Sequence, residues 1–541
     1  MTTSEQVVLI GLDGLGRSAI DEWIDDGTLS TLASIRDQGC MADLESTIPP
    51  WTPCAWPSLL SGRNPGEHGV FDFYTNDGYE KSIVDRQDVR APYIWEVADE
   101  LGFSSVAINF PVTHPVSELE HGAIIPGYLA SENTTFHPPE IRDAFEERFG
   151  EYRIYPEYNA SSGVIEKYVD VARCRRDMAQ LLTDRFDWDL LAVQFQVTDS
   201  IFHDLENSTK IREVLQSVDS YVSDIVDLAD QDPTVIIASD HGMGEYRWTF
   251  YINSWLADHG YCQTTAGNPE YFSSAKNDLR SNQEETRSSP INRLAGGATN
   301  ALSRIGLTPR AAHRALAAVG LAGHAERLLP EETQVALQNR TIDWEQSKAF
   351  QLLFNSLGVH INARSSWPSG RVPEEQYENV RANLMADLRS ITDPEGRAVF
   401  EAVHPREEVY HGSNVDRAPD IVFVPREYQY DVSGSVVDTF RRHTHMNHKP
   451  DGIFLSNRPT MTEESINRLS IFDVAPTVAV SLGIPADTDA DGEAVPIVET
   501  TQNPQPWQAI AESHLSRSIG NGKRSDTDAI ERRLSDLGYL E

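Results

Sequence analysis

Three aspartates in this chain stand where short apolar runs end, and two of them have a histidine close by. The positions are Asp13 after residues 7–10, Asp199 and His203 after residues 190–195, and Asp240 and His241 after residues 235–238. In open α/β sheets, ligands bind outside the carboxyl ends of the strands, where loops from separate strands converge. Carboxylates and imidazoles together are typical ligands of divalent cations. The pattern therefore predicts a two-metal site that could hold a phosphate group.

The elements that must position these residues alternate between strand and helix signals over residues 1–264. Apolar strand-like runs at 7–10, 105–109, 190–195 and 234–238 alternate with helical patterns at 18–25, 91–101, 164–186 and 211–229. Such alternation is typical of βαβ units around a mostly parallel sheet. The sequence therefore predicts an α/β fold whose sheet is flanked by helices.

The domain prediction divides the chain into four parts: residues 1–264 as the first part of the catalytic core, 265–345 as an inserted polar loop and helical lid, 346–500 as the rest of the core with smaller α+β elements, and 501–541 as a peripheral tail. The insertion begins with a polar stretch rich in Ser, Asn, Gln and Glu, which predicts a loop. In the third part, strand signals at 350–354, 359–362, 421–424 and 452–455 accompany helical signals at 374–391 and 473–482.

Residues 286–325 contain no acidic residue but five arginines: Arg287, Arg293, Arg304, Arg310 and Arg314. Thr308-Pro309 and Gly320 are a good helix start and stop. One interpretation is an amphipathic helix whose arginines meet the protein's own acidic surface. The other is a cationic lid over an anionic substrate, or a patch that contacts anionic lipid head groups.

The net charge of −38 is the unusual bulk property, and only seven of the 45 basic residues are lysines. Such self-repulsion destabilises a compact state in dilute buffer, whereas molar salt shortens the Debye length to about 3 Å and screens it. We therefore expect a salt-adapted protein of the haloarchaeal type, with an ordinary acidic protein as the alternative. The charge also argues against nucleic-acid binding, which needs a cationic surface.

Three further features favour a cytoplasmic location. Cys40, Cys54, Cys174 and Cys262 have no paired spacing, which fits reduced thiols better than disulfides or a zinc knuckle. No apolar run approaches the roughly 20 residues that span a bilayer. The N-terminal residues lack the basic start of a secretory signal.

Residues 47–70, expected as a loop, carry the pattern that relates the chain to a known family. Thr52 stands ten residues before Gly62, and Pro65 and His68-Gly69 complete a pattern S/T-G-x-x-P-x-x-H-G. With the aspartate motifs and His448-Lys449-Pro450-Asp451-Gly452, the chain resembles the alkaline phosphatase superfamily, in its branch of type I phosphodiesterases and nucleotide pyrophosphatases. The resemblance covers most of the chain and implies the alkaline-phosphatase-like α/β fold.

Carried over position by position, the resemblance implies one metal held by Asp199, His203 and His448. It implies a second metal held by Asp13, Asp240 and His241, with the Thr52 oxygen facing it. His443 and His445 are rivals of His448, which we prefer because the Pro-Asp-Gly that follows it matches the family. Mixed His and Asp ligation favours zinc, with manganese and iron as alternatives.

The implied chemistry is hydrolysis of a small-molecule phosphate ester. A threonine hydroxyl is a poor nucleophile until a cation lowers its pKa, and a second cation stabilises the leaving oxygen. The expected enzyme is a metal-dependent phosphodiesterase or phosphohydrolase with Thr52 as the nucleophile. The alternatives are a phosphomonoesterase or phosphomutase of the same superfamily, a sulfatase and a non-catalytic binding protein; for a sulfatase, the run from Cys54 to Leu59 lacks the C-x-P-S-R register.

The sequence departs from the family at one position. The family has an asparagine that contacts a phosphate oxygen, and the corresponding residue here is Phe73, preceded by Asp72. Backbone N–H groups near Thr52, or an arginine of the insertion, are the expected replacements. For Glu67, His68, Asp72 and Asn109 we expect structural roles.

Overall fold

The computed structural model describes residues 6–156, 163–205, 207–230, 232–266, 340–352, 356–461, 466, 468–499, 502–514 and 530. Most of the 265–345 insertion, including the five arginines of residues 286–325, and most of the 501–541 tail lie outside the described residues. The two ends of the insertion pair as antiparallel strands, β10 (Thr264–Ala266) and β11 (Arg340–Ile342).

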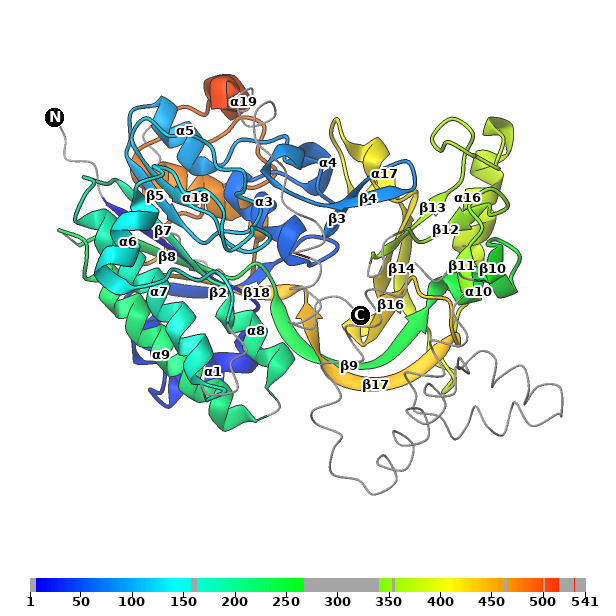
Figure 1. Ribbon diagram of the computed structural model, residues 1–541, viewed down its shortest axis with the longest axis horizontal. Coiled ribbons are helices and arrows are strands. Elements are labelled where there is room, and N and C mark those ends of the chain that lie inside the picture. Colours follow the sequence, from blue (N-terminus) through cyan, green and yellow to red (C-terminus); the bar gives the residue numbers. More distant parts are fainter. Residues whose placement is uncertain are drawn as a thin grey trace, which may run out of the picture.

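An eight-stranded sheet forms the centre of the larger part of the molecule (Figure 1). Its strands, in spatial order, are β19 (Arg468–Ser470), β2 (Cys40–Glu45), β18 (Asp451–Ser456), β8 (Thr234–Ala238), β1 (Val7–Leu12), β7 (Leu190–Phe195), β5 (Ser105–Ile108) and β6 (Gly122–Ile125). All neighbouring pairs are parallel except those made by β18, which runs antiparallel to both β2 and β8. The predicted mostly parallel α/β fold is confirmed.

Helices cover both faces of this sheet (Figure 1). One face carries α1 (Arg17–Asp25), α2 (Ser30–Gln38), α7 (Glu166–Thr183) and α9 (Ser208–Val226), with α6 (Ile141–Phe149) beside α7. The opposite face carries α3 (Thr52–Ser61), α5 (Ile94–Glu100) and α18 (Val474–Leu482), with α4 (Pro65–His68) and α19 (Trp507–Ile510) at its rim. Because both faces are covered, β1, β7 and β8 are buried along their whole length, which is why they read as continuous apolar runs.

Local sequence explains the helices that cover the sheet. Helix α9 buries residues at three- and four-residue spacing, which is the stripe of a surface helix packed on a core. Its start is capped by the Asn207 side chain, which accepts hydrogen bonds from the backbone N–H groups of Thr209 and Lys210. Helix α18 ends at Gly483, whose φ of 76° is left-handed, as the sequence predicts.

The smaller part of the molecule contains two further sheets. One has the order β12 (Ala349–Phe350), β13 (Gly358–Ile361), β15 (Ile421–Pro425) and β14 (Phe400–Pro405), with α16 (Glu374–Arg389) packed on it and α17 (Arg406–Val409) beside β14. The other has the order β16 (Tyr430–Ser433), β9 (Gly242–Tyr251) and β17 (Phe440–Lys449). The remaining short elements are α8 (Val197–Asp204), α10 (Ile252–Asp258), and the 3-10 turns η1 (Arg86–Asp88), η4 (Val415–Arg417), η5 (Arg426–Tyr428) and η6 (Ile471–Asp473).

Two antiparallel pairs connect the larger and smaller parts (Figure 1). The long curved ribbon of β9 and β17 runs from the edge of the central sheet into the smaller part. The hairpin of β3 (Tyr74–Asp77) and β4 (Glu80–Ile83) crosses on the other side, and Tyr79 at its turn stacks between Trp344 and Trp367 with ring centroids 5.2 Å apart on each side. The ribbon matters most for function because His448 lies on it.

No helix among the described residues is both long enough and apolar enough to cross a membrane.

Candidate two-metal active site

The three aspartate motifs lie side by side at the carboxyl edge of the central sheet. Strand β1 lies between β7 and β8, with Leu12 opposite Phe195 and Gly11 opposite Ala238. Asp13, the residue after β1, therefore lies beside two other strand ends. One is the point where β7 leads into α8, and the other is the point where β8 ends at Ser239-Asp240. Parallel strands make this convergence unavoidable, because their carboxyl ends share one edge.

Asp199, His203 and His448 form the first group. Asp199 and His203 are one turn apart on α8, and His448 reaches them from β17. Asp199 Oδ1 lies 3.4 Å from His203 Nε2 and 3.5 Å from His448 Nε2, and the two Nε2 atoms are 3.2 Å apart. Three ligand atoms of this group fall within 4.8 Å of one another, which is the spacing that a single cation requires.

Asp13, Asp240, His241 and Thr52 form the second group. His241 Nε2 lies 3.6 Å from Asp13 Oδ1, 3.3 Å from Asp240 Oδ2 and 3.3 Å from Thr52 Oγ1. Thr52 is the first residue of α3, so its hydroxyl lies at the positive end of that helix. All four side chains are buried.

The two groups touch, so they form one site. The rings of His241 and His448 stack with centroids 3.8 Å apart, and Asp199 also lies within 4.8 Å of ligand atoms of Asp13 and His241. The structure thus brings together all seven residues predicted for the site, Asp13, Thr52, Asp199, His203, Asp240, His241 and His448. The His203 side chain, 10% exposed, is the most accessible of them, since the other six are at most 4% exposed.

The electrostatics of the cluster fit cations. Burial, together with the charges of Asp240 and Asp199, raises the pKa of Asp13 well above its ordinary value. Burial also raises the pKa of Asp240, to about 6, and the Asp199 charge adds to the effect. Asp13 Oδ1 and Asp240 Oδ2 are buried without a hydrogen-bond partner. Buried carboxylate oxygens in this state are costly unless a proton or a metal ion compensates them.

The histidines are oriented to coordinate. His241 Nδ1 lies 3.1 Å from the carbonyl oxygen of Gly242, so Nδ1–H donates there and Nε2 keeps its lone pair toward Asp13 and Thr52. Burial lowers the pKa of His448 well below its ordinary value, and the nearby His241 lowers it further, so the ring is neutral at physiological pH. Burial disfavours the Asp199 carboxylate, but the nearby His203, His448 and His241 hold its pKa below the ordinary value. Neutral imidazoles and ionised carboxylates are the forms that bind metals.

The rival histidines lie elsewhere on β17. His443 and His445 stack on each other with centroids 4.5 Å apart, and His445 Nε2 contacts Asp431 Oδ2 at 2.8 Å. Neither belongs to a cluster of potential ligand atoms among the described residues. A bulge between Arg442 and His445 interrupts the register with β9, whereas His448 pairs regularly with Met243.

Three residues that the sequence prediction missed contact the ligand carboxylates: Trp56, Gln194 and Gln196. The sequence did contain a signal for Gln194, because a glutamine inside the buried apolar run Leu190–Phe195 needs a polar partner. For Trp56 the sequence carried no such signal, because residues 47–70 were expected as a loop. The structure instead has helix α3 there, wholly buried, with the Ser61 hydroxyl donating to the carbonyl oxygen of Pro57.

His68 of the H-G pair has the expected structural setting. Its Nδ1 accepts a hydrogen bond from the Val70 N–H, so Nε2 carries the proton and donates to the Ser58 hydroxyl at 2.9 Å. Burial lowers the pKa of His68 to about 3, so the ring stays neutral. This contact joins the last residue of α4 to the middle of α3 and so stabilises the helix that presents Thr52.

The buried carboxyl group of Asp72, near α3, makes the stability of the fold depend on pH. Its Oδ1 accepts a hydrogen bond from the Phe73 N–H at 2.6 Å, and burial raises its pKa from 3.8 to about 7. A raised carboxyl pKa in the folded state means that folding loses stability as the pH rises from about 4 to about 7, and the cost is complete above pH 7. Asp72→Asn should therefore raise the melting temperature at pH 8 by about 2 °C or more and change it little at pH 4. Thermal melts at both pH values check this, with Asp77→Asn at an exposed position as the control. Equal shifts of the melting temperature in the two variants at pH 8 would contradict the prediction.

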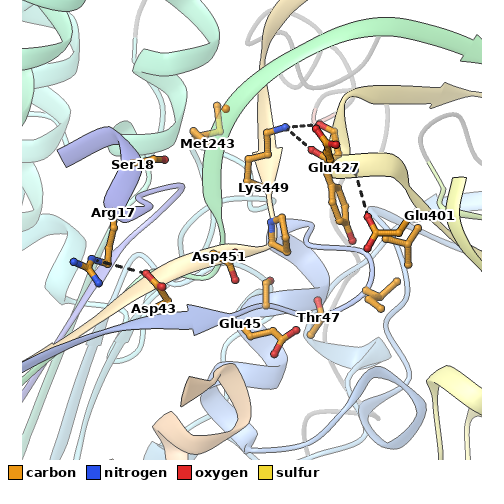
Figure 2. A pocket seen from close by; sticks show the side chains of 16 residues that line it. Arg17, Ser18, Asp43, Glu45, Thr47, Met243, Glu401, Glu427, Lys449 and Asp451 are labelled. Atoms are coloured by element: carbon orange, nitrogen blue, oxygen red, sulfur yellow. Dashed lines mark hydrogen bonds and ion pairs between the residues drawn. The ribbon is translucent and has the colours of Figure 1, made fainter. Parts of the chain in front are cut away.

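A separate cavity of about 650 Å³ is lined by residues that include Met243, Lys449 and Asp451 (Figure 2). His448 and Lys449 are neighbours on β17, so their side chains point to opposite faces, and Lys449 lines the cavity. Its ammonium donates to the backbone carbonyls of Glu245, Glu427 and Tyr428, and burial lowers its pKa to about 8. The remaining charged lining is Arg17 and five carboxylates: Asp43, Glu45, Glu401, Glu427 and Asp451. This acidic lining disfavours an anionic ligand.

Comparison with solved structures supports the fold. Phosphonoacetate hydrolase from Sinorhizobium meliloti 1021, in complex with phosphonoformate, superposes with a TM-score of 0.52 at 14% identity and covers 88% of this chain and 96% of its own. The same enzyme with phosphonoacetate gives 0.52 at 15% identity, with the same coverage. Human ectonucleotide pyrophosphatase/phosphodiesterase 5 has a TM-score of 0.48 at 13% identity, covering 90% of this chain and 97% of its own. The two likenesses with a TM-score of 0.52 confirm the expected alkaline-phosphatase-like fold.

Among curated protein sequences none matches this chain. The sequence model of one family, described as type I phosphodiesterase / nucleotide pyrophosphatase, matches residues 7–448. That range begins with β1 and ends on His448, so it includes every residue of the cluster. The chain belongs to the type I phosphodiesterase / nucleotide pyrophosphatase family and is a hydrolase of phosphoric ester bonds.

Proposed function

We propose that this protein is a metal-dependent phosphodiesterase or phosphohydrolase that uses Thr52 as its nucleophile and two divalent cations. The observation that carries the proposal is the buried cluster itself. Seven residues from five separate segments of the chain converge, and the Thr52 hydroxyl lies 3.3 Å from His241 Nε2. A merely structural cluster would pair its polar atoms, whereas Asp13 Oδ1 and Asp240 Oδ2 are left without hydrogen bonds.

Asp199, His203 and His448 would hold one cation, and Asp13, Asp240 and His241 would hold the other. Bound cations would neutralise phosphate charge, lower the pKa of a coordinated hydroxyl and stabilise a leaving oxygen. Mixed imidazole and carboxylate ligation favours zinc, with manganese as the alternative.

The chain's own contribution is the placement of the nucleophile. The Thr52 hydroxyl gives up its proton as its oxygen attacks phosphorus, while the bond from phosphorus to the leaving oxygen breaks and that oxygen takes up a proton. With a diester, the intermediate on Thr52 keeps the second ester group. Water then attacks the same phosphorus, breaks the bond to Thr52, releases a phosphate monoester (or phosphate, if the substrate was a monoester) and returns the hydroxyl. Phosphoryl transfer depends mainly on such positioning and on charge neutralisation. Phe73 stands where the family has a phosphate-binding asparagine, so we assign that contact to the Thr52 N–H at the start of α3, where the helix dipole favours an anion. Pro53 has no N–H, and the N–H groups of Cys54 and Ala55 donate to the Trp51 carbonyl oxygen.

A substrate panel tests the function. Bis-p-nitrophenyl phosphate and p-nitrophenyl phosphate, assayed at high salt with and without Zn²⁺ or Mn²⁺, should be hydrolysed only with metal, and the diester faster. Faster monoester turnover would favour the phosphomonoesterase alternative. Phosphonoacetate belongs in the panel because the phosphonoacetate hydrolase shares the fold. Turnover of p-nitrophenyl sulfate in preference to both phosphates would overturn the proposal in favour of a sulfatase.

We also propose that the protein is salt-adapted and cytoplasmic. The net charge of −38 supports salt adaptation, and the four cysteines, all unpaired, fit a reducing compartment. We expect the melting temperature to fall and activity to be lost when salt is lowered from molar concentration to below about 0.2 M, because screening is then lost. Melts across a KCl series check this, and an unchanged melting temperature would contradict it.

A further inference from the structure

We infer that Gln194 is a positioning residue whose amide side chain orients one carboxylate in each proposed metal group, Asp13 directly and Asp199 through Gln196. It lies on β7, fully buried, one residue before the end of that strand. The inference rests on the proposed metal site, but it concerns residues that no ligand pattern includes. Gln194 would not touch substrate or metal; it would act through the aspartates.

The contact with Asp13 is direct. Gln194 Nε2 donates to Asp13 Oδ2 at 2.7 Å, and Trp56 Nε1 donates to the same oxygen at 2.9 Å. Asp13 Oδ1 receives no hydrogen bond and lies 3.6 Å from His241 Nε2. Two donors on one carboxylate oxygen therefore turn the other oxygen toward the metal position.

The contact with Asp199 runs through a second glutamine. The other Nε2 hydrogen of Gln194 is directed at Gln196 Oε1, 3.3 Å away, and Gln196 Nε2 lies 3.4 Å from Asp199 Oδ2. Gln194 lies on β7, and Gln196 is the N-cap residue of α8 directly after that strand, with a helical φ of −65° and ψ of −27°. One amide thereby links a carboxylate of each proposed metal position.

The orientation of the Gln194 amide is itself determined by Asn109. Asn109 Nδ2 donates to Gln194 Oε1 at 2.7 Å and to the Gln194 carbonyl oxygen at 3.1 Å. With Oε1 occupied in this way, Nε2 must face Asp13; the reversed amide would bring an oxygen against a carboxylate. Asn109 is fully buried and has a φ of 68°, a left-handed conformation that asparagine tolerates better than most residues.

Gly11 provides the space for this arrangement. It lies opposite Gln194 on β1, and a Cβ at this position would come within 2.5 Å of the Trp56 ring and 3.0 Å of Gln194 Cγ. Both donors to Asp13 therefore occupy the volume that a larger residue would fill. The absence of a side chain at Gly11 in an otherwise apolar strand fits a hydrogen-bond network built around Asp13.

The test measures metal affinity as well as activity. Metal-stripped wild-type protein titrated with Zn²⁺ or Mn²⁺ should bind two ions. Gln194→Met, whose side chain is close in shape but has no hydrogen-bond donors, should lower the affinity for each ion about 10- to 100-fold. Gln196→Met should lower the affinity for one ion only. Saturating metal should restore part of the turnover of Gln194→Met, which a generally damaged core would not allow. Gln38→Met, the same change at an exposed position on α2, is the control.

The outcomes separate the two proposals. A folded Gln194→Met protein with wild-type affinity for both ions would overturn the positioning role and leave the metal site intact. A wild-type protein that binds neither ion would overturn the metal site, and the positioning role with it. Far-UV circular dichroism of the metal-free protein checks folding. If Gln194→Met does not fold, Gln196→Met provides the test. Unchanged metal affinity in Gln196→Met would overturn the proposed connection from Gln194 through Gln196 to Asp199.

Discussion

Thr52→Ala is expected to reduce kcat by at least about 1,000-fold while leaving both metals bound. The physical reason is that the hydroxyl is the only part of this side chain that can form a bond to phosphorus, and it lies 3.3 Å from His241 Nε2 at the start of α3. The substitution deletes two small groups in a wholly buried helix, so the ligand side chains should keep their places. Steady-state turnover of the best substrate, with metal content measured on the same sample, checks the prediction.

Thr52→Ser is the matched variant, because it keeps an oxygen at the same position and should retain measurable turnover. Thr488→Ala, at an exposed position, controls for the loss of a threonine and should behave like the wild type. Trapping of a phosphorylated residue at Thr52 by rapid quench would support the covalent step. Turnover of Thr52→Ala near the wild-type rate, with two metals bound, would remove Thr52 from its role.

His448→Ala is expected to lose one of the two metals and at least about 100-fold in kcat/KM. His448 reaches Asp199 and His203 from β17, with Nε2 3.5 Å from Asp199 Oδ1, and no other residue of that strand takes part in the cluster. Removing it leaves two ligands, too few for a tightly held catalytic cation. Metal stoichiometry and kcat/KM, measured at fixed low metal concentration, check the result.

His443→Ala and His445→Ala are matched controls, since both change a histidine of the same strand. They lie at or beyond the bulge in β17, so both should keep two metals and near wild-type turnover. His445→Ala also removes an ion pair with Asp431, which makes it a control for local disturbance of the ribbon. Loss of a metal from His443→Ala, with both metals retained in His448→Ala, would reverse the ligand assignment.

The depth of the cluster explains why these effects should be large. Five of the seven site residues have no exposed surface, and the pKa of Asp13 and that of Asp240 are raised by burial. In such surroundings water does not substitute for a missing ligand or donor. Each lost ligand therefore leaves its partners uncompensated, and the cost falls on metal binding more than on the fold of the sheet.

The sequence by itself determined the central sheet and the aspartates at its edge. Continuous apolar runs at Val7–Ile10, Leu190–Phe195 and Val235–Ala238 are typical of parallel strands buried on both faces, and parallel strands end at a common edge. That Asp13, Asp199 and Asp240 share one edge follows from that rule, whereas their positions beside one another depend on the pairing of β1 with both β7 and β8. The spacing of Thr52 relative to Gly62 and His68 indicated the proposed nucleophile through family resemblance.

Tertiary structure decided the parts that no local pattern reports. His448 was chosen over His443 and His445 by resemblance, but its contact with Asp199 depends on the register of β17 against β9 and on a bulge, which are long-range pairings. The same holds for Gln194 and Trp56, which meet at Asp13 from segments far apart in the chain. Local sequence sets which face a side chain occupies, whereas the partner it meets there depends on how distant segments pack.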